Sequence, residues 1–150
     1  LIDFTILSKD GTVFHNPKYK QLLEFGLENG FDPNLCDRDG NTVFHCTENE
    51  KVILLKAIEK GLNINKKNNN GRTILFDNMH LLKVLVNKGA NMNSVDNNGN
   101  TIFHTSSLFI DNLYWALDNG FNPNKINKYN REIQSHKQGR ISSTEKILWI

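Results

Sequence analysis

Three of the five histidines and both cysteines are the residues of this chain that most readily suggest a reaction or a metal site. Imidazole nitrogens and cysteine sulfur bind zinc, and both groups serve in nucleophilic catalysis. Cys46 follows His45 as in half of a zinc site, but no second pair lies at ligand spacing. A nucleophilic cysteine needs a base and a lowered pKa, and the sequence around Cys36 and Cys46 has a pattern for neither. The three histidines are His15, His45 and His104.

The remaining candidates for chemistry are isolated. Asp77 and Asp118 are paired with no recognisable acid or base in the sequence. The glycines occur singly, so there is no glycine-rich phosphate-binding loop. We therefore expect no catalytic residue, no metal and no cofactor in these 150 residues.

Composition narrows the class of protein. A chain of 150 residues with 38% hydrophobic and 23% charged residues fits one soluble domain with a core. Its net charge of +2 is too small to indicate nucleic-acid binding, and no apolar run is long enough to cross a membrane. Two cysteines give no disulfide framework, which is typical of a reducing compartment. We expect a monomer, and the start at Leu1 without a signal segment suggests a fragment of a longer protein.

Two short phrases recur in step along the chain. The first is an Asp-Gly or Asn-Gly turn that leads into a sequence such as Thr-Val-Phe-His, at residues 10–15, 39–45, 70–76 and 98–104. The second has the form Gly-x-Asp/Asn-x-Asn or a close variant of it. It begins at glycines that are 31, 28 and 31 residues apart, namely Gly30, Gly61, Gly89 and Gly120. Two independent phrases that keep step indicate an internal repeat.

Each phrase has a local structural meaning. The turn glycines Gly40, Gly71 and Gly99 are expected at positive φ, and the threonine that follows is expected to cap a helix. Apolar residues at helical spacing, as in residues 52–58, predict a second helix that ends at the glycine of the second phrase. The 23 asparagines are attributed mainly to an A+T-rich coding sequence and partly to turn closure.

The two phrases resemble the ankyrin repeat, which has T-P-L-H and G-A-D-x-N at the corresponding places. The resemblance covers roughly residues 5 to 135 and implies an all-α repeat solenoid of paired antiparallel helices joined by β-turn fingers. It also implies that the histidine ring at this repeated position binds the backbone of a neighbouring loop. We expect a single domain over 1–150, with repeats at about 5–34, 35–65, 66–93 and 94–124 and a degenerate C-terminal cap at 125–150.

The chain departs from the family pattern in three ways. Its units are shorter than the usual ~33 residues, and the loss precedes the second helix, which predicts short first helices. The third unit has Phe76 where its siblings have histidine. In the cap, Glu132 replaces the threonine and Ser135 replaces the histidine.

The resemblance places a protein partner on the fingers and first helices. Two of the four finger tips are basic, which indicates an acidic partner, although solvated loops explain polar tips equally well. Tyr114 and Trp115 match positions that hold lysine or glutamate in other units, so we expect exposed anchors there, or packing against the Trp149 segment. The predicted partner-binding residues are Arg38, Asp39, Lys66, Lys67, Arg72, Asn97, Asn98, Tyr114, Trp115, Lys128, Tyr129 and Arg131.

Short units and an Asn/Lys-rich composition suggest a pathogen protein, and the chain is similar to the C-terminal ankyrin domain of the OspC-type effectors that Shigella secretes into host cells. This resemblance implies an upstream NAD-dependent domain that modifies an arginine of inflammatory caspases (ADP-riboxanation) after activation by host calmodulin. The present domain would recruit the caspase in the host cytoplasm and so help to block pyroptosis. The alternative is an ankyrin host-range or adaptor protein of a large DNA virus, although no F-box-like tail is visible after Ser135.

Overall fold

The computed structural model describes residues 7–8, 11–45, 50–105, 110–125 and 127–129. Within these ranges the chain is mostly helical, as expected. The α-helices are α1 (Leu23–Glu28), α2 (Lys51–Glu59), α3 (Leu82–Asn87), α4 (Ile102–Thr105) and α5 (Ile110–Asp118). The 3-10 segments are η1 (Val13–His15), η2 (Pro17–Leu22), η3 (Ile74–Phe76) and η4 (Met79–Leu81). The strands β1 (Leu7–Ser8) and β2 (Gly11–Thr12) pair antiparallel.

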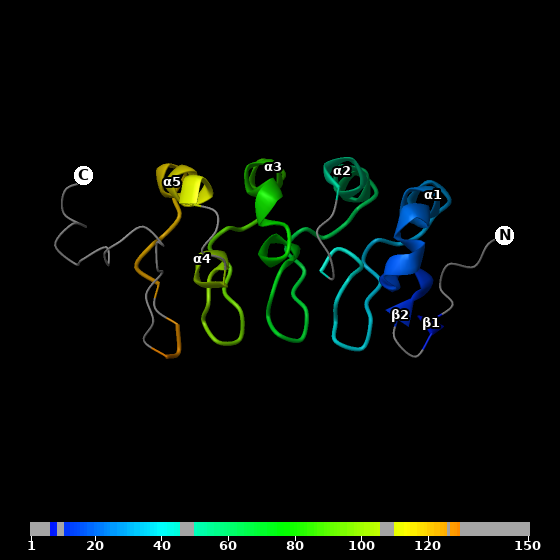
Figure 1. Ribbon diagram of the computed structural model, residues 1–150, viewed down its shortest axis with the longest axis horizontal. Helices are drawn as coiled ribbons and strands as arrows, with labels where there is room; N and C mark the ends of the chain where they lie inside the picture. Colours follow the sequence, from blue (N-terminus) through cyan, green and yellow to red (C-terminus); the bar gives the residue numbers. More distant parts are fainter. Residues whose placement is uncertain (1–6, 9–10, 46–49, 106–109, 126, 130–150) are drawn as a thin grey trace.

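The elements lie in layers (Figure 1). Helices α1, α2, α3 and α5 lie side by side in a row, and a second row of loops lies on the opposite side of the molecule. Short helical turns such as α4 lie between the two rows. The helical turns that begin inside the first phrase are three residues long in η1 and η3 and four in α4, which confirms the prediction of short first helices.

The core lies between the helix row and the short turns. Its largest fully buried side chains include Phe44, Leu54, Leu82 and Ile102. In the first and last units, the phenylalanine of the first phrase meets the phenylalanine after the helix-ending glycine edge to face. The ring centroids are 4.6 Å apart for Phe14 and Phe31 and 4.7 Å apart for Phe103 and Phe121. Residues of the two phrases therefore pack against each other in the same core.

The glycine of the second phrase ends each long helix. At the end of α2, Gly61 has φ +92°, and the next N–H, that of Leu62, donates to the Ala57 carbonyl at 2.9 Å. Only a residue that tolerates positive φ lets the chain turn back while satisfying a carbonyl of the last helical turn. The same bond closes α3, from Ala90 to Leu85, which confirms the sequence-based helix ends.

Candidate protein-binding surface

The loops of the second row share one internal bond. In the loops at 36–42, 67–73 and 95–101, the second residue donates its N–H to the carbonyl of the sixth at 2.9 Å. These bonds join Asp37 to Asn41, Asn68 to Arg72 and Asp96 to Asn100. The carboxylate or amide oxygen of the same second residue also accepts backbone N–H groups from within its loop. The carboxylates of Asp37 and Asp96 therefore accept hydrogen bonds within their own loops.

Neighbouring loops are joined to one another at their tips. Asn69 N–H donates to the Asp39 carbonyl at 2.9 Å, and Asn97 N–H donates to the Asn70 carbonyl at 2.9 Å. The third bond of the series runs from Lys128 N–H to the Asn98 carbonyl at 2.8 Å. Because each loop is tied to the next, the tips form one continuous edge, with side chains left to face outward.

The turn glycines allow this close approach. Gly40, Gly71 and Gly99 have φ of +75°, +76° and +76°, which confirms the prediction of positive φ. A Cβ on Gly71 would lie 2.8 Å from the Asn97 nitrogen of the next loop. These positions therefore serve the packing of neighbouring loops.

The histidines that suggested chemistry form hydrogen bonds with the backbone of the loops instead. Nδ1 of His45 accepts the Thr42 N–H at 3.1 Å and lies 2.9 Å from the Thr42 hydroxyl. Nε2 therefore carries the proton and donates to the carbonyls of Lys66 and Arg72 at 3.2 and 3.1 Å. Burial lowers the pKa of His45 below its usual value, so the ring stays neutral.

The other two histidines make related contacts. Nε2 of His15 lies 2.8 Å from the Asn41 carbonyl, so the expected bridge to a neighbouring loop is confirmed for His15 and His45. Nδ1 of His104 accepts the Thr101 N–H at 3.1 Å. Among the residues that the structure describes, no three His, Cys, Asp or Glu side chains lie together as metal ligands would. Cys46 lies outside those residues.

The third unit replaces the histidine bridge with other contacts. Phe76 is buried, and the Arg72 guanidinium lies over its ring at 5.1 Å. The same guanidinium lies 3.4 Å from the Asp77 carboxylate, whose pKa is raised by burial and partly lowered again by Arg72. The link to the next loop comes from the Lys67 ammonium, which donates to the Val95 carbonyl at 2.8 Å.

A second series of ties joins the second phrases. The last asparagine of each of the first three phrases donates its amide to the carbonyl of the next helix-ending glycine. Its side-chain oxygen accepts the N–H two residues beyond that glycine. For Asn65 these bonds reach Gly89 at 2.9 Å and Asn91 at 2.8 Å. We did not predict this role, although asparagine recurs at that place in the sequence. The series comprises Asn34, Asn65 and Asn93.

Three of the six predicted basic residues are engaged within the molecule. The Lys66 ammonium donates to the Asn34 carbonyl at 2.7 Å, while Lys67 and Arg72 make the contacts given above. The loop that carries these three residues is separated from Lys128 by the loop at 95–101. The basic residues of this loop and Lys128 therefore do not lie on adjacent loops.

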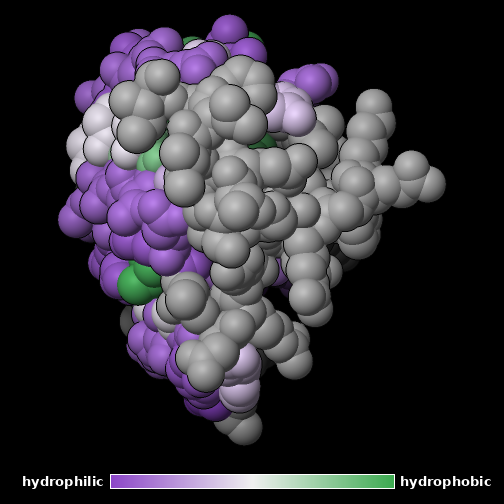
Figure 2. All heavy atoms as spheres, turned by 90° about the vertical axis from the view of Figure 1, so that its left-hand side faces the viewer, coloured by the Kyte–Doolittle hydropathy of each residue, from purple (hydrophilic) through white to green (hydrophobic). Residues whose placement is uncertain are grey.

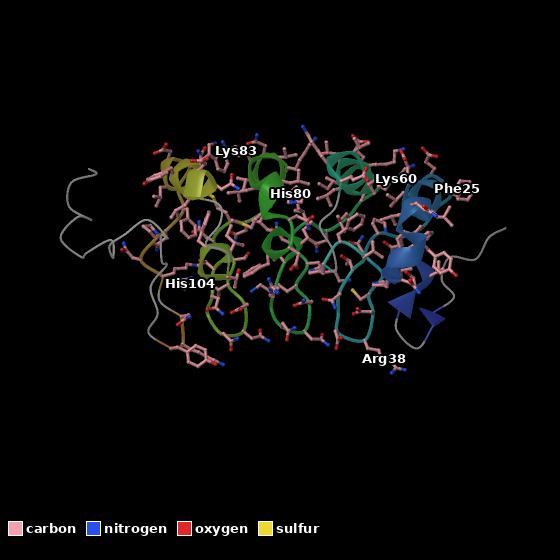
Figure 3. All side chains as sticks on the ribbon, in the orientation of Figure 1. Phe25, Arg38, Lys60, His80, Lys83 and His104 are labelled. Carbon is pink, nitrogen blue, oxygen red and sulfur yellow. The ribbon has the colours of Figure 1, made fainter. Side chains whose placement is uncertain are left out.

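The outward-facing side chains at the loop tips form what we call the loop edge. Arg38 and Asp39 are exposed at one end, and Figure 3 shows Arg38 extending beyond its loop. Lys128 and Tyr129 are exposed at the other end, with the ammonium 5.0 Å from the ring centroid. Between them, Asn97 is exposed with its amide donating to the Asn69 carbonyl, and Asn98 is half-buried. Arg131 lies outside the described residues, as do Glu132, Ser135 and Trp149.

The aromatic pair lies elsewhere. Tyr114 and Trp115 are on α5, in the helix row and away from the loops, so they lie apart from the loop edge (Figure 1). Tyr114 is 62% exposed, whereas Trp115 is half-buried against the core with the Lys83 ammonium 5.9 Å from its ring. Figure 2 views the molecule from the α5 end, where the described surface is mostly hydrophilic with small hydrophobic patches.

No protein-family model matches the chain, and a search of curated proteins finds no match either. Among the described helices, none is long and apolar enough to span a membrane.

Proposed function

We propose that this chain is an ankyrin-repeat domain that acts as a protein–protein interaction module. The observation that carries the proposal is the loop-tip bond that recurs from Asn69 to Asp39, from Asn97 to Asn70 and from Lys128 to Asn98. Such stacking makes an extended edge from short units, and extended surfaces of this kind suit a protein partner. The exposed charges on the edge are two basic residues, Arg38 and Lys128, and one acidic residue, Asp39, because Asp37 and Asp96 bond within their own loops.

The module has no catalytic role of its own in this proposal. The residues that could have supplied chemistry have structural partners, namely threonine and loop carbonyls for His15 and His45. An acidic protein surface would be attracted to Arg38 and Lys128, and an exposed tyrosine beside the lysine supplies apolar contact area.

The resemblance to OspC-type effectors extends the proposal to a partner. The chain would be the recruiting domain of a secreted effector that holds an inflammatory caspase in the host cytoplasm. An upstream NAD-dependent domain would modify the caspase and block pyroptosis. No residue of this chain takes part in that reaction.

The direct test is calorimetric titration of the purified chain with a catalytically inactive inflammatory caspase. We expect saturable binding, and no turnover of NAD by the chain alone. Absence of binding to inflammatory caspases would remove the effector proposal and leave an adaptor for another protein. NAD turnover by the chain would contradict the assignment as a pure binding module.

A further inference from the structure

Four asparagines of the chain are followed by glycine, and the structure places these pairs in two different settings. Asn-Gly is the sequence in which an asparagine side chain most readily cyclises, because the glycine has no Cβ to hinder attack by its backbone nitrogen. Two pairs lie in loop tips and two lie at helix ends. The pairs are Asn29-Gly30, Asn70-Gly71, Asn98-Gly99 and Asn119-Gly120.

In the loop tips the glycine nitrogen that would attack is held in a hydrogen bond. Gly71 N–H donates to the Asn68 carbonyl and Gly99 N–H to the Asp96 carbonyl, each at 2.9 Å. The carbonyls of Asn70 and Asn98 also accept an N–H from the next loop. Cyclisation there requires two joined loops to open together, which protects the amide in the same way that it slows hydrogen exchange.

At the helix ends the attacking nitrogen is less restrained. Gly120 N–H donates to the Leu117 carbonyl at 3.3 Å, which is a long bond. Gly30 N–H makes no hydrogen bond to any residue that the structure describes. Asn29 and Gly30 are both exposed, and the space beside the Gly30 Cα is open.

We propose that Asn29 is a site of spontaneous deamidation, and that the fold protects Asn70 and Asn98 from the same reaction. The Gly30 nitrogen loses its proton to a base in solution and attacks Cγ of Asn29, which forms a C–N bond. The bond from Cγ to Nδ2 breaks, and the amide nitrogen leaves as ammonia after taking up a proton. Water then opens the resulting succinimide at either carbonyl and gives isoaspartate or aspartate.

The modification would weaken the end of α1. The Asn29 amide donates to the Phe25 carbonyl at 2.8 Å, and a carboxylate loses that donor. The new negative charge lies one residue after Glu28, at the helix end where the backbone dipole disfavours anions. Isoaspartate also lengthens the backbone just before Gly30, whose φ of +91° makes the turn.

The test is peptide mapping by mass spectrometry, with separation of isoaspartate, after incubation of the folded chain in mildly alkaline buffer. Asn29 should gain about one dalton first, followed by Asn119. Asn70 and Asn98 should react at least about fivefold more slowly than Asn29, since a factor of about five corresponds to one ordinary hydrogen bond. In concentrated urea the four rates should converge, since the differences come from the fold.

The control is Asn29→Gln, which keeps an amide but disfavours the five-membered ring, with Asn119→Gln as the matched variant. Loss of the first modification in Asn29→Gln alone would support the assignment. The proposal would be overturned if Asn70 or Asn98 reacted as fast as Asn29 in the folded chain. It would equally be overturned if the folded and urea samples gave the same order of rates.

Discussion

Gly71 and Gly61 both adopt positive φ, but their surroundings differ. An added Cβ on Gly71 would meet the Asn97 nitrogen of the next loop at 2.8 Å, whereas one on Gly61 would meet nothing within 4 Å. The positive φ of the turn glycines was predictable, because turn geometry depends on adjacent residues. The close approach was not, because Asn97 lies 26 residues farther along the chain.

We predict that Gly71→Ala destabilises the chain more than Gly61→Ala. Backbone strain should cost about 1 kcal/mol in both variants. The approach of the two loops adds a further cost in Gly71→Ala only. Thermal denaturation measures the difference, since 1 kcal/mol corresponds to roughly 2–4 °C in a domain of this size. Equal melting temperatures would show that the two loops do not approach as described.

Burial of His45 gives stability a pH dependence near neutral pH. Its pKa in the folded chain is lowered from 6.5 by burial, so the unfolded chain binds the proton more tightly. The contribution of the neutral ring is therefore complete above about pH 6.5 and is lost as the pH falls through the lower pKa of the folded state. Protonation would also place a hydrogen on Nδ1, which accepts the Thr42 N–H.

We therefore predict that the free energy of unfolding, measured in urea, decreases from pH 7 to pH 5. In His45→Gln, which does not titrate in this range, the decrease should be smaller. An unchanged decrease in that variant would assign the pH dependence to other groups.

At the scale of elements, the ends of α2, α3 and α5 are each hydrogen-bonded to an asparagine of the preceding unit. Asn65 donates to the Gly89 carbonyl and accepts the Asn91 N–H. Asn124 has the equivalent place in its phrase, but its side chain makes no such bond to the described part of the chain. The end of each helix was predictable from its glycine. The tie was not, because its partners are 24 and 26 residues away.

We predict that Asn65→Ala lowers the free energy of unfolding by about 1 kcal/mol, the usual contribution of an intramolecular hydrogen bond. The matched variant Asn124→Ala should have almost no effect. Chemical denaturation followed by circular dichroism measures both. If both variants lost the same stability, the tie from Asn65 to the next helix end would not be what stabilises this position.

Helices α1 and α2 are also joined across their outer surface. The Lys56 ammonium lies 2.7 Å from a carboxylate oxygen of Glu24 and 2.7 Å from one of Glu28. These bonds raise the pKa of Lys56 to about 12. All three side chains are solvent-accessible, so salt screens the interaction and its contribution to stability is small.

At the scale of the whole molecule, two rows present different surfaces to solvent. Lys60 and Lys83 lie on the helix side, and Arg38 lies at the loop tips (Figure 3). The spacing of the phrases predicted the loops and helices, and it also predicted that Arg38 and Lys128 would face a partner. It did not reveal that Lys66, Lys67 and Arg72 are engaged within the molecule. The partners of Lys66 and Lys67 lie in other loops. Arg72 contacts Asp77 and Phe76, and Phe76 stands where the other units have histidine.

This distinction determines which charges to reverse in a binding experiment. Lys67→Glu would remove the tie to Val95, and Arg72→Glu would place a second carboxylate beside Asp77. Loss of binding in such variants would report misfolding as readily as lost contact. Arg38 and Lys128 are exposed, and their side chains make no hydrogen bond to the described part of the chain.

The most direct test of the account is therefore a comparison of two double charge reversals. One is Arg38→Glu with Lys128→Glu on the loop edge, and the other is Lys60→Glu with Lys88→Glu, two exposed lysines that directly follow α2 and α3 in the helix row. Both variants should fold, as circular dichroism would verify. Calorimetry with the proposed partner, an inactive inflammatory caspase, should show about a tenfold loss of affinity and a weaker salt dependence for the loop-edge variant. The helix-side variant should bind like the parent chain. Equal affinities for the two variants, or a loss confined to the helix-side variant, would contradict the assignment of the loop edge as the binding surface.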